Sequence, residues 1–219
     1  MLYHLFKYFD NVHNLPGAGM FQYISFRAAA AIIIALLIVI VFGRNIINFL
    51  RRKQIGEEIR DLGLEGQLQK KGTPTMGGVI ILLAILIPVL LFGQLDNVYI
   101  QLMLVSTIWL GLIGFLDDYE KLRHKQNLGL SAKMKFLLQL LAATCFLLLL
   151  RFTGYLSPNL YIPFWNTYVP VSEPLYFIFA AFVIVGTVNA VNITDGVDGL
   201  AAGTCVPVFL CFTAIVFCW

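Results

Sequence analysis

Six long apolar stretches are the feature of this sequence that most limits its fold. Each holds about 20 mostly apolar residues, the length that a helix needs to cross the hydrocarbon core of a bilayer. None alternates between apolar and polar residues, which favours helices over a β-barrel. The sequence therefore predicts an all-α integral membrane protein. The six predicted transmembrane helices cover residues 26–50, 76–93, 98–117, 133–152, 174–194 and 199–219.

Composition excludes the other classes of protein. Of the 219 residues, 59% are hydrophobic and only 12% are charged, against roughly 25% charged residues in an ordinary soluble domain. This much apolar surface excludes both a soluble domain and a disordered chain. The basic residues form no stripe or face, so we expect no nucleic acid partner. We predict one polytopic membrane domain over residues 1–219.

The distribution of basic residues predicts the orientation. Twelve of the 15 Lys and Arg residues lie in residues 44–71 and 121–135, whereas residues 94–97 and 153–173 contain none. Cytoplasmic loops carry the excess of basic residues, so we expect the two basic segments inside and the N-terminus outside. The last predicted span runs to Trp219 without a polar flank. We therefore expect the chain to be C-terminally incomplete.

Three polar clusters lie at the predicted cytoplasmic ends of the spans. The first covers residues 70–78 and contains two lysines and two adjacent glycines. We expect Thr73 to cap the second span, with Pro74 at its first helical position. The positive end of such a helix suits an anion. The alternative is a capped helix start with its lysines at the lipid headgroups.

The second cluster is the pair Asp117 and Asp118 at the end of the third span. Neighbouring residues on a helix do not share a face, so the two carboxylates could have different roles. A helix C-terminus disfavours negative charge, and either a divalent cation or Lys121, four residues after Asp117, would relieve it. The alternative is an ion-paired helix end without a ligand.

The third cluster joins the fifth and sixth spans. It consists of Asn189, Asn192, Asp195, Gly196 and Asp198. We expect the two asparagines to face protein or a water-filled cleft and the two Asp-Gly pairs to form a tight turn. A plain polar turn capped by Asp is the alternative. Carboxylates, lysines and a helix N-terminus on one side of the membrane suit Mg²⁺-dependent phosphate chemistry, and the bilayer surface suggests a lipid substrate.

Motifs along the whole chain resemble those of one enzyme family. They are Gln-Tyr-Ile-Ser-Phe-Arg at 22–27, Gly-Thr-Pro-Thr-Met-Gly-Gly at 72–78, Gly-Phe-Leu-Asp-Asp at 114–118, Gly-Leu-Ser-Ala-Lys at 129–133 and the run 189–200. The chain resembles the phospho-N-acetylmuramoyl-pentapeptide transferases, a family of the polyprenyl-phosphate N-acetylhexosamine-1-phosphate transferase superfamily. The Pro-Thr-Met-Gly-Gly string separates this family from its relatives that transfer GlcNAc-1-phosphate.

The resemblance implies a reaction and a fold. Phospho-MurNAc-pentapeptide would pass from its UDP carrier to undecaprenyl phosphate, giving lipid I and UMP with Mg²⁺ as cofactor, as the first membrane step of peptidoglycan synthesis. It also implies about ten helices, an active site in a cytoplasmic cleft, a location in the bacterial inner membrane and commonly a homodimer.

The resemblance also implies roles for individual residues. Asp117 and Asp118 match the family's catalytic aspartates, one thought to deprotonate or orient the lipid phosphate and the other to serve the metal, for which we choose Asp118. Four residues match positions that are important around the active site of the family: Lys70, Thr75, Lys121 and Lys133. Those that match the nucleotide pocket are Asn192, Asp195, Gly196 and Asp198.

The chain departs from the family pattern in one respect. The family's Phe-Met-Gly-Asp segment and His-rich loop are absent, and the histidines are His4, His13 and His124. We therefore expect residues 1–219 alone not to turn over. The alternatives are a GlcNAc-1-phosphate transferase, an ion-coupled transporter and a structural membrane subunit. The lack of internal repeats and the placement of the charges at span ends disfavour the transporter.

Overall fold

The computed structural model of this chain describes residues 2–13, 16–53, 76–124, 129–162, 164–196 and 199–218. Seven α-helices, a short 3₁₀ helix and one hairpin lie in these ranges. In chain order they are α1 (Leu2–His13), η1 (Ala18–Gln22), α2 (Ile24–Lys53), α3 (Gly78–Phe92), α4 (Val98–His124), α5 (Ala132–Phe152), β1 (Asn159–Ile162), β2 (Thr167–Pro170), α6 (Glu173–Thr194) and α7 (Leu200–Cys218).

A helix occupies each of the six ranges that hydropathy selected. Within the described residues, four helices are long and apolar enough to cross a membrane: Ile24–Arg52, Val98–Arg123, Ala132–Phe152 and Glu173–Thr194. The apolar parts of α3 and α7 are shorter. No more than 17% of the most apolar window of any of the four is buried inside the protein. Their apolar side chains therefore face outward, as expected for helices that lie in lipid.

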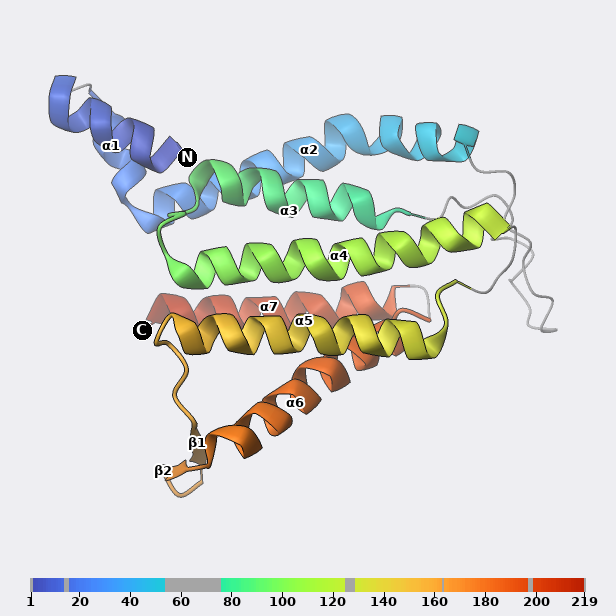
Figure 1. The fold of residues 1–219 in the computed structure, drawn as a ribbon. Coiled ribbons are helices and arrows are strands. Elements are labelled where there is room, and N and C mark those ends of the chain that lie inside the picture. Colours follow the sequence, from blue (N-terminus) through green and yellow to red (C-terminus); the bar gives the residue numbers. More distant parts are fainter. Residues whose placement is uncertain are drawn as a thin grey trace. The chain divides into compact units, whose positions relative to one another are not determined.

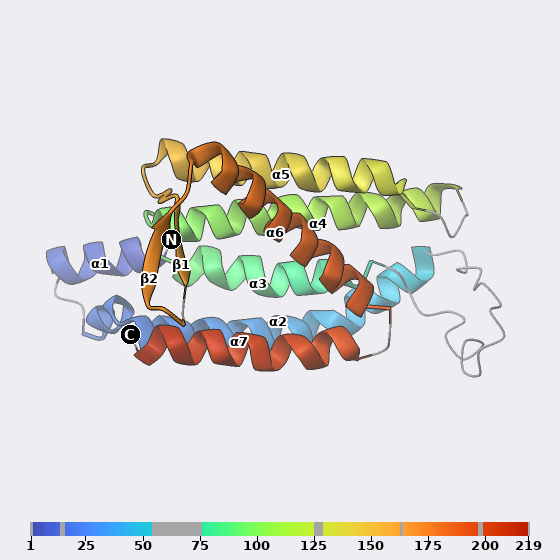
Figure 2. The same ribbon diagram turned by 90° about the horizontal axis from the view of Figure 1, so that it is seen from below.

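The chain divides into two compact units, residues 1–138 and 139–219, and the boundary falls within α5. In the first unit, α3 lies between α2 and α4 (Figures 1 and 2), and α1 and η1 pack at its C-terminal end. The buried residues of α3 repeat every four positions and form one stripe along the helix. They are Ile80, Ala84, Pro88 and Phe92. Phe21 of η1 stacks between Phe6 of α1 and Phe92, which fixes the N-terminal elements to this stripe.

The second unit contains the rest of α5, the hairpin, α6 and α7. Strands β1 and β2 pair antiparallel, with Asn159 opposite Pro170 and Ile162 opposite Thr167. The all-α prediction did not include this hairpin, whose four-residue strands are too short to stand out in an irregular loop. At the ends of the neighbouring helices, Arg151 of α5 pairs with Glu173 of α6, with Nη2 and Oε2 3.2 Å apart.

The start of α3 differs from the prediction. The helix begins at Gly78, and its N-cap residue Gly77 makes no side-chain capping hydrogen bond. Just before it, Met76 has φ = 66°, a left-handed conformation that does not continue a right-handed helix. The predicted cap at Thr73 with Pro74 at the first helical position is therefore wrong for α3. Lys70 and Thr75 lie outside the described residues.

Candidate functional site

Asp117 is the centre of a charged cluster at the C-terminal part of α4. Its Oδ1 lies 2.9 Å from Nζ of Lys135 and accepts a hydrogen bond from the backbone N–H of Leu130 at 2.8 Å. Its Oδ2 lies 3.0 Å from Nζ of Lys121. Only 13% of the Asp117 side chain is exposed. Both carboxylate oxygens therefore have cationic or N–H partners, which compensate the charge where it is screened from water.

Asp118 is the more open of the two carboxylates. Its Oδ1 lies 3.0 Å from the same Lys121 amine, and 30% of its side chain is exposed. The Lys121 Nζ thus bridges two adjacent aspartates at i+3 and i+4, the spacings that bring helical side chains together. Of the two ways to relieve the charge of the aspartates that the sequence left open, the ion pair of Lys121 with Asp117 is present. The described contacts leave Asp118 better placed than Asp117 to accept a further ligand.

The polar end of α4 is longer than predicted. The predicted span ended at Asp117, but the helix continues to His124. The two aspartates therefore lie within the last turns of the helix rather than at its end. Lys121 offsets their unfavourable interaction with the helix dipole.

The segment that leads into α5 closes over Asp117. A Cβ atom at Gly129 would collide with the Asp117 carboxylate, so this close approach requires glycine. Leu130 follows with the N–H donor, and α5 then presents Lys135 to the same carboxylate. The Gly-Leu-Ser-Ala-Lys motif is thus the part of the chain that positions the partners of Asp117.

Sequence reasoning missed Lys135. Lys133, two positions earlier, was predicted to bind substrate; it is exposed in the first turn of α5, and its role stays a prediction. Positions two apart on a helix do not face the same way, so only one of these two lysines can point to Asp117. Which one does so depends on how the preceding segment enters α5, and no local spacing reveals that.

The third polar cluster belongs to the second unit. Asp195 is the C-cap residue of α6, and Gly196 follows it in a turn. Asn189 does face protein, because its Nδ2 donates to Oε1 of Gln139 at 2.6 Å and to the carbonyl of Val185 at 2.8 Å. Asn192, which was expected to face either protein or a water-filled cleft, is exposed.

A single site that unites the three clusters stays a prediction. The described part of the first cluster and the aspartate pair lie in one unit, whereas Asn192, Asp195 and Gly196 lie in the other. Asp198 is outside the described residues. The structure brings together Asp117, Asp118 and Lys121, and adds Lys135 to them.

The described residues offer at most part of the ligand set of a metal ion. Among the described residues, no group of three or more His, Cys, Asp or Glu side chains could hold a metal ion. Mg²⁺, however, is commonly bound by one or two carboxylates, with phosphates and waters as its other ligands. Asp118 can supply such a carboxylate, whereas Asp117 is already surrounded by its lysines and the Leu130 N–H.

These observations define a membrane protein with a compact cluster of carboxylates and lysines suited to phosphate ligands. The model of glycosyl transferase family 4 matches residues 100–218, which include both aspartates and the third polar cluster. This match covers more than half of the chain, and the chain belongs to glycosyl transferase family 4. Signature 1 of the phospho-N-acetylmuramoyl-pentapeptide-transferases also matches residues 70–82.

Curated bacterial relatives support this assignment. The chain is 39% identical over 256 residues to the phospho-N-acetylmuramoyl-pentapeptide-transferase of Flavobacterium johnsoniae, covering 93% of this chain and 60% of the relative. The protein of that name from Desulfotalea psychrophila is 44% identical over 207 residues, covering 93% and 56%. The one from Porphyromonas gingivalis is 60% identical over 137 residues, covering 63% and 32%.

The chain therefore spans about 60% of the length of the first of these relatives. Its long apolar helices and its bacterial relatives identify it as a bacterial membrane protein.

Proposed function

We propose that the protein to which this chain belongs transfers phospho-MurNAc-pentapeptide from UDP-MurNAc-pentapeptide to undecaprenyl phosphate, producing lipid I and UMP. The observation that carries this proposal is the similarity over 93% of the chain to relatives named for phospho-MurNAc-pentapeptide transfer. The match to the family's signature supports it. So does the carboxylate–lysine cluster, which has the charges that a diphosphate substrate needs.

The reaction is a displacement at phosphorus. An oxygen of the lipid phosphate attacks the sugar-linked phosphorus of the UDP substrate, and the bond from that phosphorus to the oxygen of UMP breaks. A new pyrophosphate then links the lipid to the sugar, and UMP leaves with the electron pair. The lipid phosphate is already largely ionised at neutral pH, so it needs positioning more than deprotonation.

The described residues would have different roles in this reaction. Lys135 and the Leu130 N–H hold Asp117 in one orientation, and Lys121 joins it to Asp118. Asp118 offers a carboxylate to Mg²⁺, and the ion would neutralise charge on the phosphates. Lys121 supplies positive charge at the same place. We assign Lys133, Asn192, Asp195 and Gly196 to substrate binding, together with Lys70, Thr75 and Asp198.

Six membrane crossings and the orientation are also part of this proposal. Helix α3 has 15 residues, about 22 Å at the helical rise, which is shorter than a hydrocarbon core of about 30 Å. Residues on either side of α3 would complete its crossing. The basic segments 44–71 and 121–135 favour a cytoplasmic location for Asp117 and Asp118. We further propose that the protein is a homodimer in the bacterial inner membrane.

The test is UMP release in detergent from UDP-MurNAc-pentapeptide and undecaprenyl phosphate, with Mg²⁺ or with EDTA. It should be run on the 219-residue chain and on any longer product of its gene. Mg²⁺-dependent UMP release that stops when undecaprenyl phosphate is omitted is the expected result. Release from UDP-GlcNAc in place of UDP-MurNAc-pentapeptide would overturn the assignment and favour a GlcNAc-1-phosphate transferase.

A further inference from the structure

Arg27 is a buried arginine with incomplete partners, close to the start of α2. Only 8% of the residue is exposed. Its Nη1 donates to the carbonyl of Phe92 at 3.4 Å, at the long end of hydrogen-bond distances. Its guanidinium carbon lies 4.5 Å from the centre of the Tyr3 ring, while its buried Nε has no acceptor among the described residues. The charge is therefore only partly compensated.

Two carboxylates of the same unit, Asp10 and Asp96, lie beside other side chains. Asp10 of α1 accepts a hydrogen bond from Nε2 of Gln22 at 2.8 Å. Asp96, between α3 and α4, lies 3.4 Å from Nε2 of His4. Neither forms an ion pair with Arg27 in the described structure. A buried cation that lacks an internal anion can be compensated by an anion from outside the chain.

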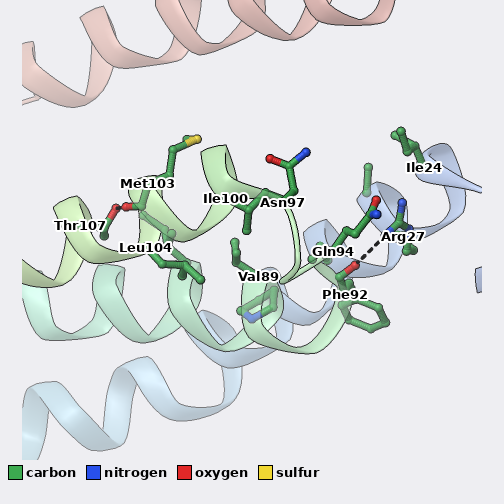
Figure 3. Close-up of a pocket in the computed structure, with 15 residues that line it drawn as sticks. Ile24, Arg27, Val89, Phe92, Gln94, Asn97, Ile100, Met103, Leu104 and Thr107 are labelled. Atoms are coloured by element: carbon green, nitrogen blue, oxygen red, sulfur yellow. Dashed lines mark hydrogen bonds between the residues drawn. The ribbon is translucent and has the colours of Figure 1, made fainter. Parts of the chain in front are cut away.

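Arg27 lines a pocket of about 440 Å³ between the start of α2, the end of α3 and the first half of α4. Figure 3 shows Arg27 and Gln94 at one end of this pocket and Leu104 and Thr107 at the other. The Thr107 hydroxyl donates its hydrogen to the carbonyl of Met103 at 2.7 Å, so it cannot donate a hydrogen bond to a ligand phosphate. The pocket is thus cationic and polar at one end and apolar at the other.

The pocket extends from near the starts of α2 and α4 towards the middle of α4. Arg27 is the fourth residue of α2, about 5 Å from the helix start, and Thr107 is the tenth residue of α4, about 14 Å along that helix. The second distance is nearly half of a hydrocarbon core of about 30 Å. Ile24 and Met103 line the pocket and are 74% and 69% exposed. They lie on helices long enough to span the membrane, so a lipid can enter sideways from the bilayer.

We propose that this pocket binds an anionic phospholipid, with the lipid phosphate against the Arg27 guanidinium and an acyl chain along Val89 and Leu104. Gln94 contributes an amide beside the arginine. Asn97 contributes its Nδ2, since its Oδ1 already accepts from the backbone N–H of Tyr99 at 2.9 Å. The site is separate from the aspartate cluster, because Thr107 and Asp117 are ten positions apart on α4, which corresponds to about 15 Å along the helix. The proposal does not depend on the proposed function.

The test is native mass spectrometry of the full chain, released from detergent that contains equal amounts of phosphatidylglycerol and phosphatidylcholine. We expect the wild type to retain phosphatidylglycerol in preference to phosphatidylcholine. Arg27→Gln should weaken this preference about five-fold, the effect of losing one basic contact at a membrane surface. Arg44→Gln is the matched control, because it removes the same charge from an exposed position on the same helix.

A second variant covers the case in which Arg27→Gln fails to fold. Ala31→Leu keeps the arginine but adds bulk to the pocket lining, so it should reduce retention of phosphatidylglycerol. An unchanged preference in Ala31→Leu, or in a folded Arg27→Gln, would overturn the proposal. So would complete displacement of the lipid by millimolar inorganic phosphate, because the site would then take small anions rather than a lipid.

Discussion

Lys135 of α5 lies 2.9 Å from Asp117 of α4, across 18 positions of sequence. This ion pair joins the start of α5 to the carboxylate that also accepts from Lys121 and from the Leu130 N–H. Lys135 therefore helps to fix the orientation of Asp117, and we propose that this orientation matters for the reaction.

Lys135→Met should lower kcat with a smaller effect on the KM for the UDP substrate. Without Lys135, the Asp117 carboxylate loses a partner and its fixed orientation, whereas residues that bind the nucleotide are untouched. Lys135→Arg is the control, because it keeps the charge and should recover part of the rate. A double-mutant cycle with Asp117→Asn should give a coupling energy of about 0.5–3 kcal/mol, as for residues in contact. Additive effects in that cycle would contradict the positioning role.

The two aspartates should respond differently to Mg²⁺. Asp118→Asn should raise the Mg²⁺ concentration needed for half-maximal UMP release by at least about ten-fold. Loss of a residue that only orients a metal ligand already lowers metal affinity by about this factor. Asp117→Asn should lower kcat strongly without shifting the Mg²⁺ concentration that the residual activity needs, because the oxygens of Asp117 are occupied by Lys121, Lys135 and the Leu130 N–H. The measurement is a Mg²⁺ titration at saturating substrate. Equal shifts of the required Mg²⁺ concentration in both variants would contradict this difference and would show that both aspartates contribute to the metal site.

Gly129→Ala should destabilise the protein by about 1–3 kcal/mol, the usual effect of overpacking. The added methyl group would collide with the Asp117 carboxylate and push the entry to α5 away from it. Gly186→Ala is the matched control, because a Cβ at this helical position meets nothing within 4 Å, and Ala in place of Gly favours a helix. Thermal unfolding in detergent should therefore show a lower midpoint for Gly129→Ala and an equal or higher one for Gly186→Ala. The reverse order would refute the close approach at Gly129.

The sequence was sufficient to locate α2 to α7, because a bilayer imposes a length and an apolar composition that loops do not share; α1 and η1, which are short, were not among the six predicted transmembrane helices. The helix ends were less predictable. Thr73 and Pro74 form a common start signal, yet α3 begins at Gly78 because Met76 adopts a left-handed conformation. Helix α4 continues beyond Asp117 to His124, and the ion pairs of Lys121 with both aspartates lie within this extension.

The site was predictable where its members are neighbours in sequence. Asp117, Asp118 and Lys121 share one helix, and their spacing alone brings them together. Lys135 and Arg27 were not predictable as partners or pocket residues. The contact of Lys135 depends on the path of the chain before α5. The burial of Arg27 depends on the packing of Tyr3 and Phe92 around it, and an arginine near the start of a span otherwise extends towards water.

Substitutions of Asn189 and Asn192 should have different effects, although the two residues are only three positions apart on α6. Replacing Asn189 should lower the stability of the protein, and replacing Asn192 should weaken substrate binding. Asn189 donates to the buried Gln139 at 2.6 Å, so Asn189→Ala leaves the Oε1 of that buried amide without its partner. The expected cost in stability is about 1–3 kcal/mol. Asn192 is exposed, so Asn192→Ala should leave the unfolding midpoint unchanged and raise the KM for the UDP substrate. Unfolding curves and UMP-release kinetics on both variants test this pair. An unfolding midpoint that falls equally in both would show that Asn192 is also held in the packed structure and would remove the argument for its role in binding.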